Sequence, residues 1–185
     1  AKPRGAMSAA VAEALANPSE AVGVPSAPTS IVTTERVGAN VVPEKSALRS
    51  LSMSSSDHVL AVAIEPSRLA AGLVDASGAV LLRDRVATPS RDVWRALEQL
   101  IRRVIAAAPE GLGAPRAVGV SCTGPIDVRA GTVSPPLVPA WTGFPLREHL
   151  ERLTGRPVEL DTAGGAVTEA ERWLGEAAGV SSYLK

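Results

Sequence analysis

The sequence predicts an α/β domain, with a mixed sheet of about five strands covered by helices and the elements in the order βββαβαβα. Three observations support this prediction. Short apolar runs follow one another closely after residue 58, a segment with helical periodicity comes next, and the later β-prone runs are separated by further helical segments. Strands joined by tight turns pair antiparallel, whereas strands joined through helices are typical of parallel crossovers, so the sheet should contain both.

The first three strands are predicted to form an antiparallel meander. Their apolar runs are Val59–Ile64, Leu69–Val74 and Ala79–Val86. The last two runs are joined by Asp75-Ala76-Ser77-Gly78, whose aspartate and glycine suit a tight turn.

A helix is predicted between residues 90 and 109. Apolar residues recur there at helical spacing, Ser90 is placed to cap the amino end, and Pro109 ends the pattern. The arginines of this part of the chain are interleaved with acidic residues, which predicts a solvated face and not a phosphate-binding surface: Arg83, Arg85, Arg91, Arg95, Arg102 and Arg103.

Two further strands and two further helices are predicted in the second half. The strands are the short apolar runs Ala117–Ser121 and Val158–Leu160. A helix at Pro145–Leu153 should end at Gly155, because glycine commonly follows a helix. The final helix should cover about Ala166–Ala178, with apolar and charged residues on opposite faces.

Composition divides the chain near residue 57. All aromatic residues lie beyond that point, and residues 1–57 are rich in alanine, proline and serine. This segment has one short predicted helix, Ser8–Ala16, and one β-prone piece, Ser30–Thr34. Its apolar area is too small to offset its ordering entropy, so we expect a tail or linker that is ordered only where it docks, or an extension before an original start at Met53. Residues 58–185 are expected to form the globular lobe.

Charge and cysteine content exclude several classes of protein. Lysine plus arginine equals aspartate plus glutamate at 19 each, which gives no electrostatic footprint for nucleic acid or an anionic membrane. No apolar run is long enough to span a bilayer. Cys122 is the single cysteine and cannot form an internal disulfide, which fits a reducing compartment, so we expect a cytoplasmic protein.

Several motifs follow one another along the second part of the chain: Val59-Leu60-Ala61-Val62, Leu73 through Gly78, Val118 through Asp127, Gly131-Thr132-Val133, Trp141 through Leu146 and Glu171 through Gly175. In this order and spacing they resemble the first lobe of the ROK family of sugar kinases and transcriptional repressors. The Gly-Pro-x-Asp loop and the Trp-x-Gly-Phe-Pro-Leu turn are the most specific of them. The resemblance covers His58–Lys185 and implies an actin-like, ribonuclease-H-like ATPase lobe.

The first departure from active members of this family lies at the end of the first strand. Active members carry Asp-x-Gly-Gly-Thr-Lys there, and its glycines let backbone amides approach nucleotide phosphates. In this chain Ala63 replaces the aspartate, Glu65 and Pro66 replace the two glycines, and Ser67 follows them. Because proline has no amide donor and glutamate adds negative charge, the resemblance implies a degenerate phosphate turn.

The second departure concerns the general base. Active members carry Asn-Asp-Ala-Asn, in which the aspartate takes the proton of the sugar hydroxyl and the last asparagine holds the sugar. Alignment on Glu171 places Ala163 at the base and Gly165 at that asparagine. A methyl group cannot accept a proton, so no catalytic residue is expected. A register shifted by two residues would put Asp161 in the base role but breaks the match of the following helix.

Five residues are candidates for a remnant of the sugar pocket: Thr123, Gly124, Asp161, Thr162 and Gly165. Thr123 and Gly124 lie in the loop that the family places beside the sugar, yet Gly-Pro is also what an ordinary turn requires, and both interpretations stay open. Asp161 and Thr162 have the chemistry to hydrogen-bond a sugar. A carboxylate at the end of a strand commonly caps the next helix, however, and a cap is the preferred interpretation.

Other reactive residue types favour structural roles. Cys122 lies in no Cys/His motif and is predicted to be a buried packing thiol. His58 and His149 do not make a zinc site, so neither a metal nor another cofactor is expected. Trp141 and Phe144 are predicted to form a structural clasp between loop and helix.

The resemblance also bears on partners. In the family fold, nucleotide lies between two lobes, and the match here covers only the first. We therefore expect another protein chain or a second lobe to cover the open side, near Trp173, Leu174 and Tyr183, since exposed apolar patches usually mark interaction surfaces. A sugar ligand is a further expectation.

Three functions follow from these observations. The first is a non-catalytic ROK-like module that acts through protein interaction or residual sugar sensing, which the two degenerate motifs favour. The second is the ligand-sensing domain of a ROK-type transcriptional regulator, although residues 1–57 show no helix-turn-helix pattern. The third is part of a sugar kinase that needs a second lobe.

Overall fold

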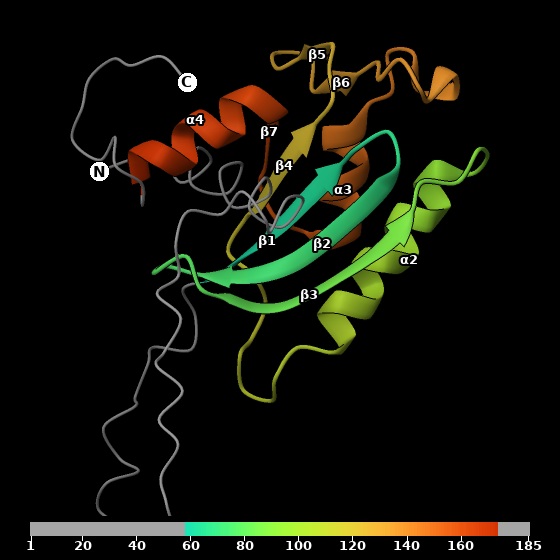
Figure 1. The fold of residues 1–185 in the computed structure, drawn as a ribbon. Coiled ribbons are helices and arrows are strands. Elements are labelled where there is room, and N and C mark those ends of the chain that lie inside the picture. Colours follow the sequence, from blue (N-terminus) through green and yellow to red (C-terminus); the bar gives the residue numbers. More distant parts are fainter. Residues whose placement is uncertain (1–57, 174–185) are drawn as a thin grey trace, which may run out of the picture.

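The computed structural model describes residues 58–173, which form a five-stranded sheet with helices on both faces (Figure 1). The strands lie side by side in the order β3-β2-β1-β4-β7, so β3 and β7 are the two edges. Their bounds are β1 His58–Ile64, β2 Arg68–Asp75, β3 Val80–Ala87, β4 Val118–Cys122 and β7 Val158–Thr162.

The sheet is mixed, as predicted. β1, β2 and β3 form the antiparallel meander, and β4 and β7 extend the sheet from β1 by parallel pairing. The turn between β2 and β3 is built on Asp75, whose Oδ1 accepts the backbone N–H groups of Ser77 at 2.8 Å and Ala79 at 3.0 Å. Gly78 has a φ of 89°, a conformation that favours glycine.

Three short elements were not predicted. β5 (Ile126–Asp127) and β6 (Thr132–Val133) form a small separate sheet, and a 3-10 helix, η2, covers Pro139–Trp141. They lie beyond the carboxyl ends of β4 and β7 (Figure 1). Elements of two or three residues are too short to show a periodic pattern in the sequence.

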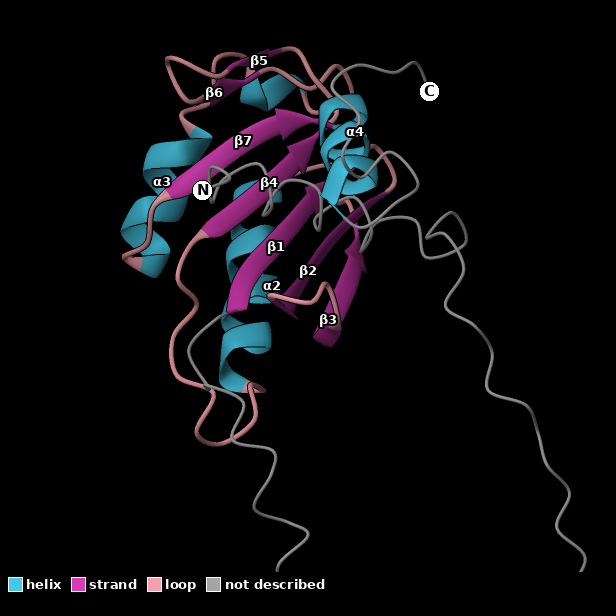
Figure 2. Ribbon diagram, turned by 90° about the vertical axis from the view of Figure 1, so that its left-hand side faces the viewer, coloured by secondary structure: helices cyan, strands magenta, loops and turns pink. Residues whose placement is uncertain are grey.

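The helices cover the two faces of the sheet unequally. Figure 2 shows α2 (Val93–Ala106) and α3 (Leu146–Thr154) behind the sheet, whereas α4 (Ala163–Trp173) crosses in front of it. The main core lies between the sheet, α2 and α3, and includes Leu60, Val62, Ile64, Leu97, Leu100, Ile101, Leu146 and Leu150. Because side chains alternate along a strand, Ala61 and Ala63 of β1 face the α4 side.

The start of α2 differs from the prediction. The residue before the helix is Asp92, which has a φ of 53° and makes no side-chain capping hydrogen bond. The expected cap at Ser90 is therefore wrong, because the chain enters the helix through a left-handed residue. The carboxyl ends agree with the sequence: α2 stops before Pro109, and Gly155, with a φ of 65°, donates its N–H to Glu151 O at the end of α3.

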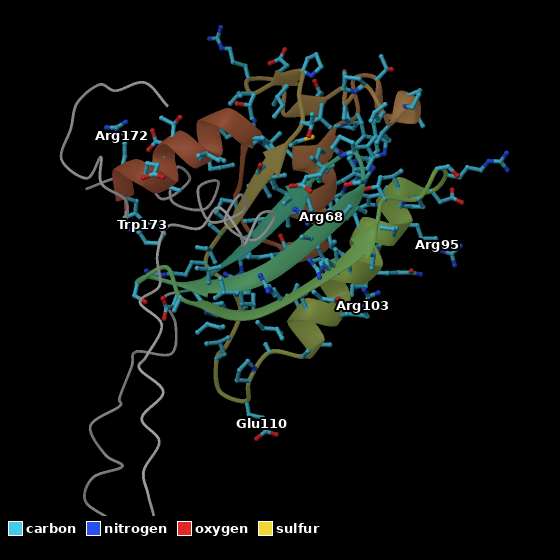
Figure 3. All side chains as sticks on the ribbon, viewed as in Figure 1. Arg68, Arg95, Arg103, Glu110, Arg172 and Trp173 are labelled. Atoms are coloured by element: carbon cyan, nitrogen blue, oxygen red, sulfur yellow. The ribbon has the colours of Figure 1, made fainter. Side chains whose placement is uncertain are left out.

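The start of α4 also differs, since the helix begins at Ala163 and not at Ala166. Trp173 packs against Val59 and the buried Ala61 and Val74 of the sheet, and Figure 3 shows it at the end of α4. Trp173 is half-buried in this position, and the expectation that an uncovered apolar patch lies near it stays a prediction. Leu174 and Tyr183, named with it, lie outside the described residues.

An aromatic cluster joins the η2 loop to α2 and α3. Trp141 and Phe144 are stacked, with ring centroids 4.5 Å apart and an interplanar angle of 7°. Phe144 lies 4.6 Å from the ring of His149, and Trp94 of α2 lies 4.9 Å from the same ring. The predicted clasp is confirmed, and it extends to a second helix.

The arginines of β3 and α2 form a solvated face, as predicted. Arg103 pairs with Asp84 at 2.9 Å and Arg102 pairs with Glu98 at 2.7 Å. Arg95 points away from the protein in Figure 3. Exposed pairs of this kind contribute little to stability and are screened by salt.

Residues 1–57, with the expected helix Ser8–Ala16 and strand Ser30–Thr34, lie outside the described residues, so the domain boundary at residue 57 stays a prediction. None of the helices between residues 58 and 173 has the length and hydrophobicity that crossing a bilayer requires.

Candidate functional site

The residues singled out from the sequence gather where three parallel strands end. Ile64 of β1 is aligned with Cys122 of β4, which is in turn aligned with Thr162 of β7. Thr123 ties the first two strands together, because its N–H donates to Ile64 O at 3.1 Å and its hydroxyl lies 3.4 Å from the same oxygen. The loops that follow β1, β4 and β7 therefore meet at one edge of the sheet.

The turn between β1 and β2 is a closed hairpin. The Glu65 N–H donates to Arg68 O at 3.0 Å, and Pro66 and Ser67 are exposed at the tip. The Arg68 Nε donates to Glu65 Oε2 at 2.6 Å. The Thr88 hydroxyl, from the residue after β3, donates to Glu65 O at 2.9 Å. Backbone and side-chain bonds thus fix this turn within the sheet.

These bonds change the interpretation of Glu65. The expectation treated it as added negative charge facing a phosphate, but the structure pairs this carboxylate with Arg68 inside the turn. The turn instead lacks free amide donors, because the Glu65 N–H is already bonded to Arg68 O and Pro66 has no N–H. Arg68 was missed in the sequence, where its spacing of three residues from Glu65 was the available signal.

Ala63 lies on the α4 side of the sheet, with 1% of its surface exposed. It packs against Ala70 of β2, and it is aligned with Ser121 of β4. Ser121 is in turn aligned with Asp161 of β7. The position that carries an aspartate in active members is thus occupied by a small apolar residue, in a buried row with Ala70 and Ser121 across the sheet.

The loop after β4 is compact. Gly124 is half-buried, and a Cβ built on it would lie 3.8 Å from Thr162 Cγ2, so this loop and the end of β7 are in contact distance. The Gly124–Pro125 peptide bond is cis, and Pro125 O accepts the Ser134 N–H at 2.9 Å. Thr123 and Gly124 therefore lie beside Thr162, as a shared site requires.

The first turn of α4 is capped by Thr162 and not by Asp161. The Thr162 hydroxyl accepts the Gly165 N–H at 3.1 Å, which satisfies one of the unpaired amides at a helix start. Asp161 supports this cap, since its Oδ1 accepts the Thr162 N–H at 2.7 Å. The preferred interpretation of Asp161 as the cap is therefore wrong by one residue.

Ala163, at the base position, is the first residue of α4 and is half-buried. The carboxylate of Asp161, which a shifted register would make the base, lies instead against Gly165. Burial raises the pKa of Asp161 above its ordinary value, and the negative charge of Glu169 raises it further, against the hydrogen bonds from Thr162.

The other candidate groups are structural within the described residues. Burial raises the pKa of Cys122 to about 12, so the thiol is protonated at neutral pH and is no nucleophile. The ring Nδ1 of His149 lies 2.9 Å from Pro145 O. Between residues 58 and 173 no group of His, Cys, Asp and Glu side chains has the geometry to hold a metal ion.

The strand order, the helices on opposite faces and the converging strand ends place this lobe in the class of actin-like ATPases. A ROK family glucokinase from Streptomyces griseus, solved with glucose and AMPPNP, is 30% identical and matches with a TM-score of 0.56 over 66% of this chain and 38% of that chain. A ROK family transcriptional regulator, a homologue of the E. coli MLC protein, has the same fold at 18% identity and a TM-score of 0.51, over 57% of this chain and 27% of that chain.

The ROK family profile matches residues 59–185, and the chain belongs to the ROK family. The N-acetyl-D-glucosamine kinase of Photobacterium profundum is 36% identical over 101 residues, which cover 55% of this chain and 33% of that protein. The chain therefore spans about a third of the length of the curated relatives it matches.

Proposed function

We propose that this chain is a non-catalytic ROK module that binds a sugar at the carboxyl edge of its sheet and acts through another protein chain or lobe, without transferring phosphate. The observation that carries the proposal is Ala163 at the base position, where the family resemblance requires an aspartate. A general base typically contributes a factor of about 10² to 10⁴ to the rate. Its loss alone would leave slow catalysis, so a second defect matters.

The second defect is the closed turn between β1 and β2. Binding a phosphate there requires free amide donors on a backbone that approaches closely. In this turn the Glu65 N–H is bonded to Arg68 O, and Pro66 offers no donor. One defect lies at the start of α4 and the other in the turn after β1, and they affect different steps, so together they support the loss of phosphoryl transfer more strongly than either does alone.

Retained sugar binding is supported by what remains at the edge. Thr123 and Gly124 lie beside Thr162 and Asp161, and together they offer hydroxyl and carboxylate groups. The curated relatives include N-acetyl-D-glucosamine kinases, and the S. griseus relative was solved with glucose. Hexoses and N-acetylhexosamines are therefore the ligands to test first.

The test is calorimetric titration of the purified chain with magnesium-ATP and, separately, with glucose, N-acetylglucosamine and N-acetylmannosamine. Light scattering gives its mass, and a coupled assay gives phosphoryl transfer. We expect sugar binding, or association with another chain, without ATP binding or turnover. Micromolar affinity for ATP, or turnover that depends on ATP, would overturn the proposal.

A ligand-sensing role in a transcriptional regulator is the second candidate. It is favoured because a ROK family transcriptional regulator has the same fold as this lobe. The family resemblance does not imply that a regulator needs the catalytic groups. It differs from the first candidate in its partner, because binding of sugar should then change affinity for DNA in the whole protein. A gel-shift titration with the complete gene product, with and without sugar, separates the two.

A further inference from the structure

One face of the sheet is covered by the described elements only in part. Figure 1 shows α4 beside β4 and β7 and away from β3, and the helix packs on β4 and β7. Farther across the same face lie Ala63 of β1 and Ala70 of β2. They pack against each other and against no other apolar residue between positions 58 and 173. Together with Gly72 of β2, we call these residues the open face.

The open face is nevertheless buried. Ala63 is 1% exposed and Ala70 is 4% exposed, and Gly72 is also buried. Side chains of one carbon atom or none rise little above a sheet, so they cannot shield one another from water. A sheet face of this kind is buried only when a second layer packs on it. The open face therefore needs a layer that residues 58–173 do not supply.

The β3 side of the open face is basic. Arg85 of β3 is aligned with Ala70, and Arg83 is aligned with Gly72, so both arginines border the open face. Both side chains are exposed, and neither forms an ion pair within the part of the chain that the structure describes. A segment that packs on the open face is therefore expected to carry an acidic residue on this side.

The segment Ser8–Ala16, for which the sequence predicts a helix, has a matching composition, although it lies outside the described residues. It consists of alanine apart from Ser8, Val11, Glu13 and Leu15, and Glu13 is its single charged residue. Small side chains allow a helix to approach a sheet of alanine and glycine closely. A helix this short is marginal in water by itself, so it gains stability only by packing on a surface.

We propose that Ser8–Ala16 docks as a helix on the open face of its own chain, next to α4, with Glu13 facing Arg83 and Arg85. Residues 17–57 connect this helix to β1. An extended chain spans about 3.3 Å per residue, which is ample to cross strands that lie about 5 Å apart. The docked helix completes the layer that α4 begins and keeps the open face from other chains. This inference does not depend on sugar binding.

Proximity is tested by disulfide formation in the complete chain. The native thiol does not compete, because burial raises the pKa of Cys122 to about 12. Glu13→Cys paired with Arg85→Cys should form an intramolecular disulfide under mild oxidation at least about tenfold faster than Glu35→Cys paired with Arg85→Cys. Docking raises the effective concentration of the two thiols above that of a flexible linker. Glu35 lies in the same leading region but outside the segment, so it is the matched control.

The stabilising effect is tested by thermal unfolding of the complete chain. Val11→Asp with Leu15→Asp places two carboxylates on one side of the helix, and burying them without partners is costly. We expect the melting temperature to fall by several degrees. Val22→Asp with Val24→Asp changes two apolar residues outside the segment and should leave the melting temperature unchanged.

The remaining outcomes identify other occupants of the open face. A disulfide that links two molecules, seen as a dimer on a non-reducing gel, would show that the segment docks on a second copy and would overturn docking within one chain. Equal rates of disulfide formation in the two pairs, together with equal melting temperatures, would assign the open face to another protein chain or to residues 174–185. Either result refutes the proposal and leaves the sugar-binding proposal untouched.

Discussion

The burial of single residues in this lobe predicts how stability changes with pH and with mutation, and His58 is the first example. The residue is 2% exposed, and neither ring nitrogen has a hydrogen-bond partner among the described residues. Burial lowers the pKa of His58 below its ordinary value of 6.5. The unfolded chain therefore binds a proton that the folded chain excludes as the pH falls.

The sign of the pH dependence follows directly. The contribution of His58 to stability is complete above the unfolded pKa of 6.5 and is lost as the pH falls through the lowered folded pKa. We expect the free energy of unfolding, measured with urea, to decrease between pH 7 and pH 5. His58→Leu, which cannot titrate, should show a smaller decrease, and an identical decrease in both proteins would contradict the assignment.

Ala63 gives a second prediction at this scale. Ala63→Asp, the residue of active relatives, would place a carboxylate in the buried row beside Ala70 and Ser121. Leaving a buried polar group without partners costs about 1 to 3 kcal/mol, and more for a charge. Thermal unfolding should show this loss, whereas Ala87→Asp, at an exposed position of β3, should stay within about 0.5 kcal/mol of the parent.

At the scale of elements, the two helix starts contrast. Thr162 caps α4 through its hydroxyl, whereas Ser90 makes no such bond to α2. Thr162→Ala should cost about 0.5 to 2 kcal/mol, and Thr162→Ser should retain most of the cap. Ser90→Ala should have almost no effect on urea unfolding, and a loss equal to that of Thr162→Ala would show that the cap of α2 has been misjudged.

The same elements explain how far the sequence could predict the structure. The five strands and three helices were predictable because each has a full period of apolar residues or a clear turn, as at Asp75 and Gly155. The start of α2 was not predictable, because Asp92 has a left-handed backbone conformation that local propensity does not indicate. The pair Glu65 and Arg68 depends on hairpin closure, which composition does not reveal.

For the candidate site, the positions were predictable and their contacts were not. Matching motifs identified Ala163 and Gly165 as the altered positions. The close approach of the Asp161 carboxylate to Gly165 depends on the rotamer of Asp161 and on the residue at which α4 begins. The predicted start of α4 was three residues too late, so this contact could not be predicted. Whether Asp161 or Thr162 caps α4 likewise depends on the residue at which the helix begins, and a shift of one residue changes the answer.

At the scale of the whole molecule, repair of the motifs should not restore a kinase. The change would be Ala63→Asp, Glu65→Gly, Pro66→Gly, Ala163→Asp and Gly165→Asn together. This chain spans about a third of the length of its curated relatives, and the family fold places nucleotide between two lobes. The new asparagine would also meet the Asp161 carboxylate. We expect no phosphorylation of glucose in a coupled assay that uses ATP, and clear turnover by the repaired chain alone would contradict the argument.

The position of β3 at the edge of the sheet has a consequence for self-association. An edge strand exposes backbone groups that can pair with another copy, which is a route to aggregation. β3 carries Arg83, Asp84 and Arg85 in succession. Antiparallel pairing of two copies centred on Asp84 would set Asp84 against Asp84 and each Arg83 against the other copy's Arg85. Like charges directly opposite each other destabilise such a pair, so this edge resists fibre formation at high concentration.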